Sequence, residues 1–150
     1  MLQAVGKGDK LSRVVRDATT LGAARVVAVQ TARSVSNGAE RAPRRQERWR
    51  GVAVQAARQC GRGDLPELQG PWPLDEALER AVTDRGVHIG LDPGGGPLLP
   101  ALATWRPPLP LVLAVGPEGG FTAEELERLR SRGFSLARLG AYTLRTEVAA

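Results

Sequence analysis

A glycine-rich turn directly after a buried strand constrains this chain more than any other feature. Residues 112–115 form a short apolar run typical of a buried parallel strand, and residues 116–120 read Gly-Pro-Glu-Gly-Gly. Thr122, with Glu125 three residues later, is a capping box that begins a helix. Ligands of open α/β sheets bind at the carboxyl ends of strands, and glycines let backbone amides approach them closely because no Cβ intervenes. The turn therefore predicts a ligand site in an α/β fold.

A second turn of the same kind lies downstream. Residues 135–139 are a further short strand, and residues 139–146 read Leu-Gly-Ala-Tyr-Thr-Leu-Arg-Thr. Either turn alone is common in α/β proteins. The two turns in this order and spacing are a much more specific signal.

The rest of the chain alternates between helical and strand patterns. Strands that alternate with helices predict one domain, residues 1–150, built on a parallel sheet with helices on both faces. Residues 63–73 are expected to be a connection with a brief extended piece at residues 67–68, and residues 92–97 a flexible loop. Caps and spacing predict helices at residues 10–21, 43–60, 74–84 and 123–132, and strands at residues 26–29, 87–91, 109–115 and 135–139.

Composition narrows the class of protein. The chain has 150 residues, 42% of them hydrophobic, which suits a single domain with its own core. Cys60 is the only cysteine, so an internal disulfide and a cysteine-rich metal site are excluded, and no metal is expected. No apolar run reaches about 18 residues, and the N-terminal residues show no secretory signal. We therefore expect a cytoplasmic protein that does not enter a membrane.

Charge is divided unevenly along the chain. Residues 1–62 hold 13 Lys/Arg against 4 Asp/Glu, a net of +9, whereas residues 63–150 hold 8 against 12, a net of −4. The positive half thus contains neither glycine turn. This division favours an enzyme that acts on a polyanion, with a solvated arginine-rich surface as the alternative interpretation.

The two turns together resemble the ribosomal RNA small subunit methyltransferase E family, part of the SPOUT superfamily of knotted methyltransferases. The family pattern GPEGGF(S/T), E, LG and LRxETA stands here as GPEGGFTAEE…LARLGAYTLRTEVAA. Against the family pattern we expect three departures: no N-terminal PUA-like RNA-binding barrel, Thr20 in place of an acidic residue, and the loss of most of the helix that normally follows LRxETA. The resemblance continues through residues 7–10, 20–22, 31–35, 47–49 and 59–62.

The resemblance implies a fold and a cofactor. It implies a deep C-terminal trefoil knot, in which the chain after Leu139 passes through the preceding loop. S-adenosylmethionine would then bind among three neighbouring loops at residues 91–96, 116–120 and 139–144. The expected cofactor-binding residues are Leu91, Gly116, Gly119, Gly120, Leu139, Gly140 and Leu144.

The resemblance implies methyl transfer to N3 of a uridine. This reaction requires a group that favours loss of the ring proton, since this nitrogen is protonated at neutral pH. A positive charge near the uracil carbonyls would do so, and Arg145 is our first candidate because it follows the second glycine turn within the motif. Glu118 is the second catalytic candidate, as a base or as a group that orients the donor, although it could equally cap a neighbouring turn.

The substrate implied by the resemblance is small-subunit ribosomal RNA, bound by a homodimer. Arginines suit phosphate contacts because the guanidinium binds phosphate through two hydrogen bonds. Our candidates for RNA contact are Arg33, Arg44, Arg45, Arg48 and Arg62. Arg48 and Arg62 are favoured because they lie at positions that match the family.

Other functions stay open from the sequence. One alternative is a knotted methyltransferase that acts on another RNA position. A second is an RNA-binding or dimerisation module without activity. A plain nucleotide- or phosphate-binding α/β domain would explain the glycine turns but not the second motif.

Overall fold

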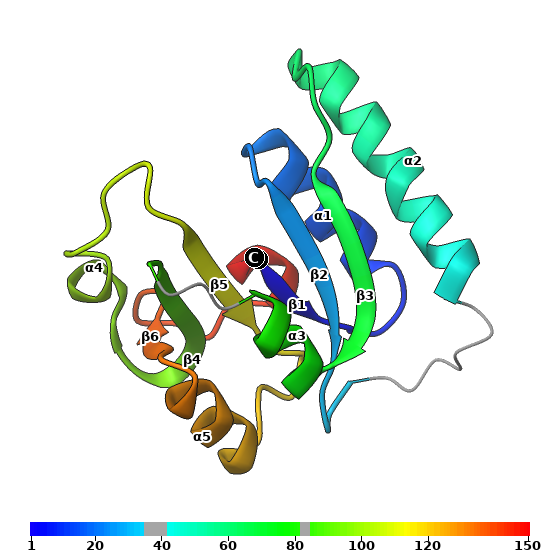
Figure 1. Cartoon of the computed structure of the whole chain (residues 1–150). Helices are drawn as coiled ribbons and strands as arrows, with labels where there is room; N and C mark the ends of the chain where they lie inside the picture. The colour runs from blue at the N-terminus through cyan, green and yellow to red at the C-terminus, as the bar shows by residue number, and fades with distance from the viewer. Residues whose placement is uncertain (35–41, 82–84) are drawn as a thin grey trace.

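A six-stranded, wholly parallel sheet forms the centre of the computed structural model, which describes residues 1–34, 42–81 and 85–150 (Figure 1). Its strand order is β3-β2-β1-β5-β4-β6. The chain therefore builds one half of the sheet outward from β1 and then crosses to build the other half. The strands are β1 (Leu2–Ala4), β2 (Arg25–Gln30), β3 (Glu67–Pro73), β4 (Val87–Pro97), β5 (Leu111–Val115) and β6 (Ser135–Arg138).

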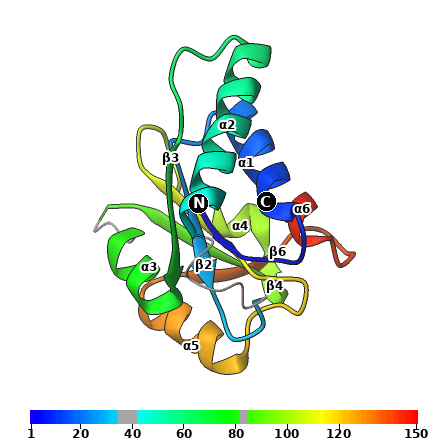
Figure 2. The same cartoon turned by 90° about the vertical axis from the view of Figure 1, so that its right-hand side faces the viewer.

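Helices cover both faces of this sheet (Figure 2). Helices α1 and α2 pack on one face, α3 and α5 pack on the other, and the last helix, α6, lies against α1. The predicted parallel sheet with helices on both faces is thereby confirmed. The helices are α1 (Lys10–Thr20), α2 (Ala42–Cys60), α3 (Leu74–Ala81), α4 (Leu98–Ala101), α5 (Ala123–Ser131) and α6 (Thr146–Ala149).

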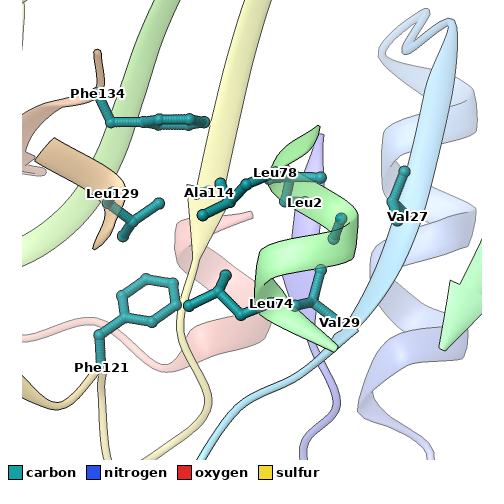
Figure 3. Packing of buried hydrophobic residues seen from close by; sticks show 10 residues of the cluster. Leu2, Val27, Val29, Leu74, Leu78, Ala114, Phe121, Leu129 and Phe134 are labelled. Atoms are coloured by element: carbon teal, nitrogen blue, oxygen red, sulfur yellow. The ribbon is translucent and has the colours of Figure 1, made fainter. Parts of the chain in front are cut away.

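The alternation of side chains along β2 explains why two helical layers are needed. Val27 and Val29 point into the core under α3 and α5, whereas Val26 and Ala28 point into the core under α1 and α2. Both faces of the strand are apolar, as expected for a parallel sheet that is covered on both sides. Figure 3 shows the first of these cores, in which Leu78 of α3 lies beside Leu2 of β1 and Ala114 of β5.

The predicted helices form where their local signals lie. Leu11, Val14, Val15 and Ala18 of α1 are buried along one stripe at helical spacing. At α5, the Thr122 side chain accepts a hydrogen bond from the Glu125 backbone, and the Glu125 carboxylate accepts one from the Thr122 backbone. This is the capping box read from the sequence.

Three strands differ from the prediction, and the short helix α4 was not predicted. Strand β1 was not expected because it is only three residues long. Strand β3 spans the whole of residues 67–73, which we expected to be mostly a connection; as an edge strand it tolerates Pro71 and Pro73. Strand β4 continues to Pro97 rather than ending in a flexible loop, because a residue at 95 without a side chain can lie directly against β6. A Cβ at Gly95 would be 2.6 Å from the Ala137 nitrogen.

The strand order also predicts where a ligand can bind. The order reverses between β1 and β5, which pair side by side at the centre of the sheet. On the two sides of such a point, the connections from the strands run to opposite faces of the sheet. This leaves a crevice at the carboxyl ends of the strands. The first glycine turn follows β5 at this position.

Candidate functional site

A cavity of about 480 Å³ lies at the carboxyl edge of the sheet, beside the point where the strand order reverses. It is within the size range of small-molecule sites in proteins. Residues within β4 and the segments that follow β5 and β6 supply most of its wall, and α1 and α6 supply the rest. The lining consists of Lys10, residues 91–93, residues 115–118, Gly120, residues 138–147 and Ala149.

The cavity brings together six of the seven residues that we predicted for cofactor binding. The three loops of the prediction, far apart in sequence, meet at this one cavity. Gly119 alone lies outside its lining. The predicted residues on the wall are Leu91, Gly116, Gly120, Leu139, Gly140 and Leu144.

The first glycine turn is compact because two of its glycines allow it to be. The Gly120 amide donates to the Pro117 carbonyl at 2.9 Å, and Gly120 has a φ of 70°, in the left-handed region. A Cβ on Gly116 would lie 3.2 Å from the backbone of Gly120 and Phe121. A larger residue at position 116 would therefore push the turn open.

Gly119 faces the other side of the turn, toward Arg33. The Arg33 guanidinium donates to the Gly119 carbonyl at 2.5 Å, and a Cβ on Gly119 would lie 3.1 Å from the Arg33 side chain. Arg33 was predicted to contact RNA. In the structure Arg33 binds the first glycine turn from outside the cavity.

Thr146 anchors the opposite wall of the cavity. Its buried hydroxyl donates to the Gly116 carbonyl at 2.5 Å and accepts from Gln3 Nε2 at 3.2 Å. One side chain thus connects α6, the glycine turn and β1. Sequence reasoning missed Thr146, and nothing in its local pattern would have identified this contact across the fold.

Glu118, one of the two catalytic candidates, is an ion-pair partner of Lys10. The two are 2.9 Å apart, and Glu118 also accepts from the Lys7 backbone at 3.0 Å. Burial raises the pKa of Glu118, but the hydrogen bond from Lys10 and those from backbone amides outweigh it and hold the pKa below its ordinary value. Glu118 is therefore ionised at neutral pH and is a weak base.

Arg145, the other catalytic candidate, lies at the N-cap of α6 with extended backbone angles, on the wall of the cavity. The residue is exposed and directly precedes the buried Thr146. Anchoring of Thr146 therefore fixes the backbone of Arg145 while its long side chain stays accessible at the rim. This is a suitable position for a cation that meets a bound substrate.

The predicted RNA-contacting arginines divide by environment. Arg44 and Arg45 lie in the first turn of α2, and Arg44 is exposed. Arg48 is exposed as well but pairs with Asp9 at 2.6 Å. Arg62 is different, because its side chain is only 13% exposed and binds the Thr19 carbonyl at 3.0 Å as well as Asp64. Arg62 thus connects the end of α2 to the end of α1.

Within residues 1–34, 42–81 and 85–150, no group of three or more His, Cys, Asp or Glu side chains is arranged to hold a metal ion. In the same ranges, no helix has both the length and the apolar character needed to cross a bilayer. His88 is buried against Phe134, with ring centroids 5.2 Å apart, and burial lowers its pKa.

Fold and cavity together define an α/β domain with a glycine-walled ligand site where its strand order reverses. The family model that matches it is described as an RNA methyltransferase domain and covers residues 1–150. The chain belongs to this RNA methyltransferase family, in agreement with the resemblance read from its two turns.

Curated relatives carry the name ribosomal RNA small subunit methyltransferase E. The Bacillus subtilis protein is 33% identical over 149 residues, which cover 95% of this chain and 58% of the relative. The Mycobacterium tuberculosis protein is 32% identical over 155 residues, covering 100% of this chain and 58% of the relative. The chain thus spans somewhat more than half the length of the curated relatives it matches.

Solved structures share the fold closely. A Legionella pneumophila protein in complex with S-adenosylmethionine is 31% identical, with a TM-score of 0.87 over 99% of this chain and 60% of that one. A ribosomal RNA small subunit methyltransferase E from Neisseria gonorrhoeae, bound to S-adenosylmethionine, is 27% identical, with the same TM-score and coverage.

Proposed function

We propose that this chain is the methyltransferase domain of an S-adenosylmethionine-dependent enzyme that methylates N3 of a uridine in small-subunit ribosomal RNA. The observation that carries the proposal is the cavity at the carboxyl edge of the sheet, where all three predicted loops meet. Support also comes from the two solved relatives that hold S-adenosylmethionine and share the fold.

The residues around the cavity fit this cofactor. Leu91, Leu139 and Leu144 offer apolar walls for an adenine ring, and the volume of about 480 Å³ is sufficient for a nucleoside with an amino-acid tail. Gly116 and Gly120 offer backbone rather than side chain at the wall, which suits close polar contacts. S-adenosylmethionine bound here would supply an electrophilic methyl group.

Arg145 is the residue we assign to the acceptor base. From the rim of the cavity its guanidinium would stabilise negative charge on the uracil carbonyls as N3 loses its proton. Glu118, the other candidate, is less suited to accept that proton because Lys10 keeps its pKa low. We therefore give the chemical role to Arg145 and a supporting role to Glu118.

The RNA would approach from the basic half of the chain. Arg44 and Arg45 lie in the first turn of α2. One turn further along, Arg48 pairs with Asp9, and the next residue, Lys10, lines the cavity. This connected path from α2 to the cavity supports RNA contact by Arg44, Arg45 and Arg48. Arg33 and Arg62 have the structural contacts described above and are weaker candidates.

Assembly and topology complete the proposal. Tyr142 is 86% exposed and Val148 is 63% exposed beside the cavity, which fits a surface covered by a second copy in a homodimer. The chain leaves β6 at one edge of the sheet and returns to its centre, where Thr146 meets Gln3. This return supports the expected trefoil knot. A cytoplasmic site of action follows from a ribosomal RNA substrate.

A methyl-transfer assay tests the proposed function. The chain would be incubated with methyl-labelled S-adenosylmethionine and small ribosomal subunits that lack uridine N3 methylation, and the RNA digested to nucleosides for mass spectrometry. We expect label in N3-methyluridine. Label in another nucleoside would reassign the target position. Cofactor binding without any transfer, even when an RNA-binding barrel is supplied as a separate chain, would favour the silent RNA-binding module.

A further inference from the structure

Lys10 lies where two walls of the cavity approach each other. It is the first residue of α1, it lines the cavity, and its side chain is 27% exposed. Its ammonium nitrogen is 2.9 Å from Glu118 Oε1 and 3.4 Å from Glu147 Oε2. A single cation therefore serves two carboxylates.

The two carboxylates come from different segments of the chain. Glu118 belongs to the glycine turn after β5, and Glu147 belongs to α6, beyond the second glycine turn. The Glu147 side chain is only 9% exposed, and its Oε2, the oxygen nearest to Lys10, is buried. Two partly buried carboxylates at one cation would repel each other if the cation were removed.

The backbone next to Lys10 also receives Glu118. The Lys7 amide donates to Glu118 Oε1 at 3.0 Å, and a Cβ on Gly6 would lie at 3.0 Å from the same oxygen. The loop between β1 and α1 thus binds this carboxylate through its backbone. Because Glu118 belongs to the turn after β5, the contact holds that turn against the loop.

We propose that Lys10 is a positioning residue that latches the glycine turn to α6 through Glu118 and Glu147, and so holds two walls of the cavity at the spacing the cofactor needs. This inference rests on the proposed function, because it takes the cavity to be the cofactor site. Lys10 acts through the two walls and has no chemical step of its own.

The protonation states agree with this geometry. The hydrogen bond to Glu118 raises the pKa of Lys10, although partial burial opposes it. For Glu147, the hydrogen bond from its own backbone amide and the interactions with Lys10 and Arg145 lower the pKa. All three groups are therefore charged at neutral pH, and acid that protonates the carboxylates would open the latch.

Calorimetric titration with S-adenosylhomocysteine at several pH values tests the latch. Lys10→Met keeps the length of the side chain but removes its charge, and we expect the affinity at neutral pH to fall by about tenfold, equivalent to about 1.4 kcal/mol. Lys10→Arg should restore most of the affinity because it keeps the charge. Lys7→Met is the matched control, since the described residues show Lys7 contacting Glu118 through its backbone rather than its side chain.

The pH profile separates a latch from a purely structural lysine. In the wild-type protein the pKa values of Glu118 and Glu147 are lowered, so affinity should be constant near neutral pH and fall as acid protonates them. In Lys10→Met, protonation would instead relieve carboxylate repulsion, so affinity should stay level or rise toward acid. Lys10→Met with wild-type affinity, or with the wild-type pH profile, would overturn the inference.

Amide hydrogen exchange tests the proposed role of Lys10 even in the absence of a ligand. Lys10→Met should speed amide exchange in α6, while Lys7→Met should leave it unchanged. If the wild-type protein binds no S-adenosylhomocysteine, the proposed function fails. The exchange measurement still tests the latch in that case. Unchanged exchange in α6 of Lys10→Met would refute it.

Discussion

The hydroxyl of Thr146 donates a hydrogen bond of 2.5 Å to the carbonyl of Gly116, 30 residues earlier in the chain. Both ends of this bond are buried, and both residues line the cavity. Gln3 completes the connection by donating to the same hydroxyl at 3.2 Å. The wall formed by α6 is therefore fixed to the glycine turn and to β1 by one side chain.

Replacing Thr146 by Val should destabilise the protein by about 1–3 kcal/mol, because the similar shape is kept while two buried polar groups each lose a hydrogen bond. Urea denaturation would measure this change. Thr20→Val is the control, since the Thr20 hydroxyl bonds an exposed helical carbonyl and its loss should cost less than about 0.5 kcal/mol. Equal stabilities of the two variants would contradict the anchoring role.

Removing the Arg145 side chain should affect catalysis rather than cofactor binding. We expect Arg145→Ala to slow methyl transfer by about a hundredfold or more, the usual cost of losing a group that stabilises charge in the transition state. Affinity for S-adenosylhomocysteine should change little. Arg145→Lys should recover part of the rate, since it keeps the charge but loses the planar fork. A wild-type rate in Arg145→Ala would end this assignment.

Reversing the charge of Arg44 and Arg45 should weaken RNA binding several-fold. Loss of phosphate contacts should also flatten the dependence of log K on log salt, by about 0.7 per contact for single-stranded RNA. Arg128 and Arg130 are the matched pair, because they lie on α5 and interact with Asp75 and Glu127. Equal losses from both pairs, measured by fluorescence anisotropy over a salt series, would indicate a general effect of net charge.

Arg33 distinguishes two roles, support of the glycine turn and contact with RNA. Because its guanidinium holds the Gly119 carbonyl, we expect Arg33→Ala to lower the affinity for S-adenosylhomocysteine several-fold. RNA affinity should fall less than in the Arg44 and Arg45 variant. Parallel titrations with cofactor and RNA decide between the roles, and a loss confined to RNA would return Arg33 to the predicted RNA contacts.

Local signals predicted much of this fold. The capping box at Thr122 and Glu125 and the apolar stripe of α1 each depend on a few neighbouring residues, and both form as predicted. Strands β1 and β3 were missed or shortened because one is three residues long and the other is an edge strand containing prolines. Their identity as strands comes from pairing with β2, which is information outside each segment.

The sequence predicted the location of the candidate site but not the contacts that support it. Glycine turns after β5 and β6 identified the cavity, since parallel strands bring their carboxyl ends to one edge. The supports of the turn were not predictable in this way. Lys10 and Thr146 reach it from distant parts of the chain, and the opposite orientation of Gly119 is visible only once Arg33 is placed beside it.

Steric filling of the cavity checks the location of the cofactor site. Ala141 lies on the cavity wall and is exposed, so Ala141→Trp should occupy the site without disturbing the core. Leu21→Trp places the same ring at an exposed position outside the cavity. We expect only the first variant to lose affinity for S-adenosylhomocysteine. Retained affinity in a folded Ala141→Trp protein would move the site elsewhere.

Isothermal titration of the unmodified chain with S-adenosylhomocysteine tests the central claim most directly. The proposed cofactor site predicts saturable binding of one molecule per chain, with ATP and inorganic phosphate failing to compete. Absence of binding up to about 1 mM, which corresponds to a binding free energy weaker than about −4 kcal/mol, would contradict the claim, as would tighter binding of ATP than of S-adenosylhomocysteine.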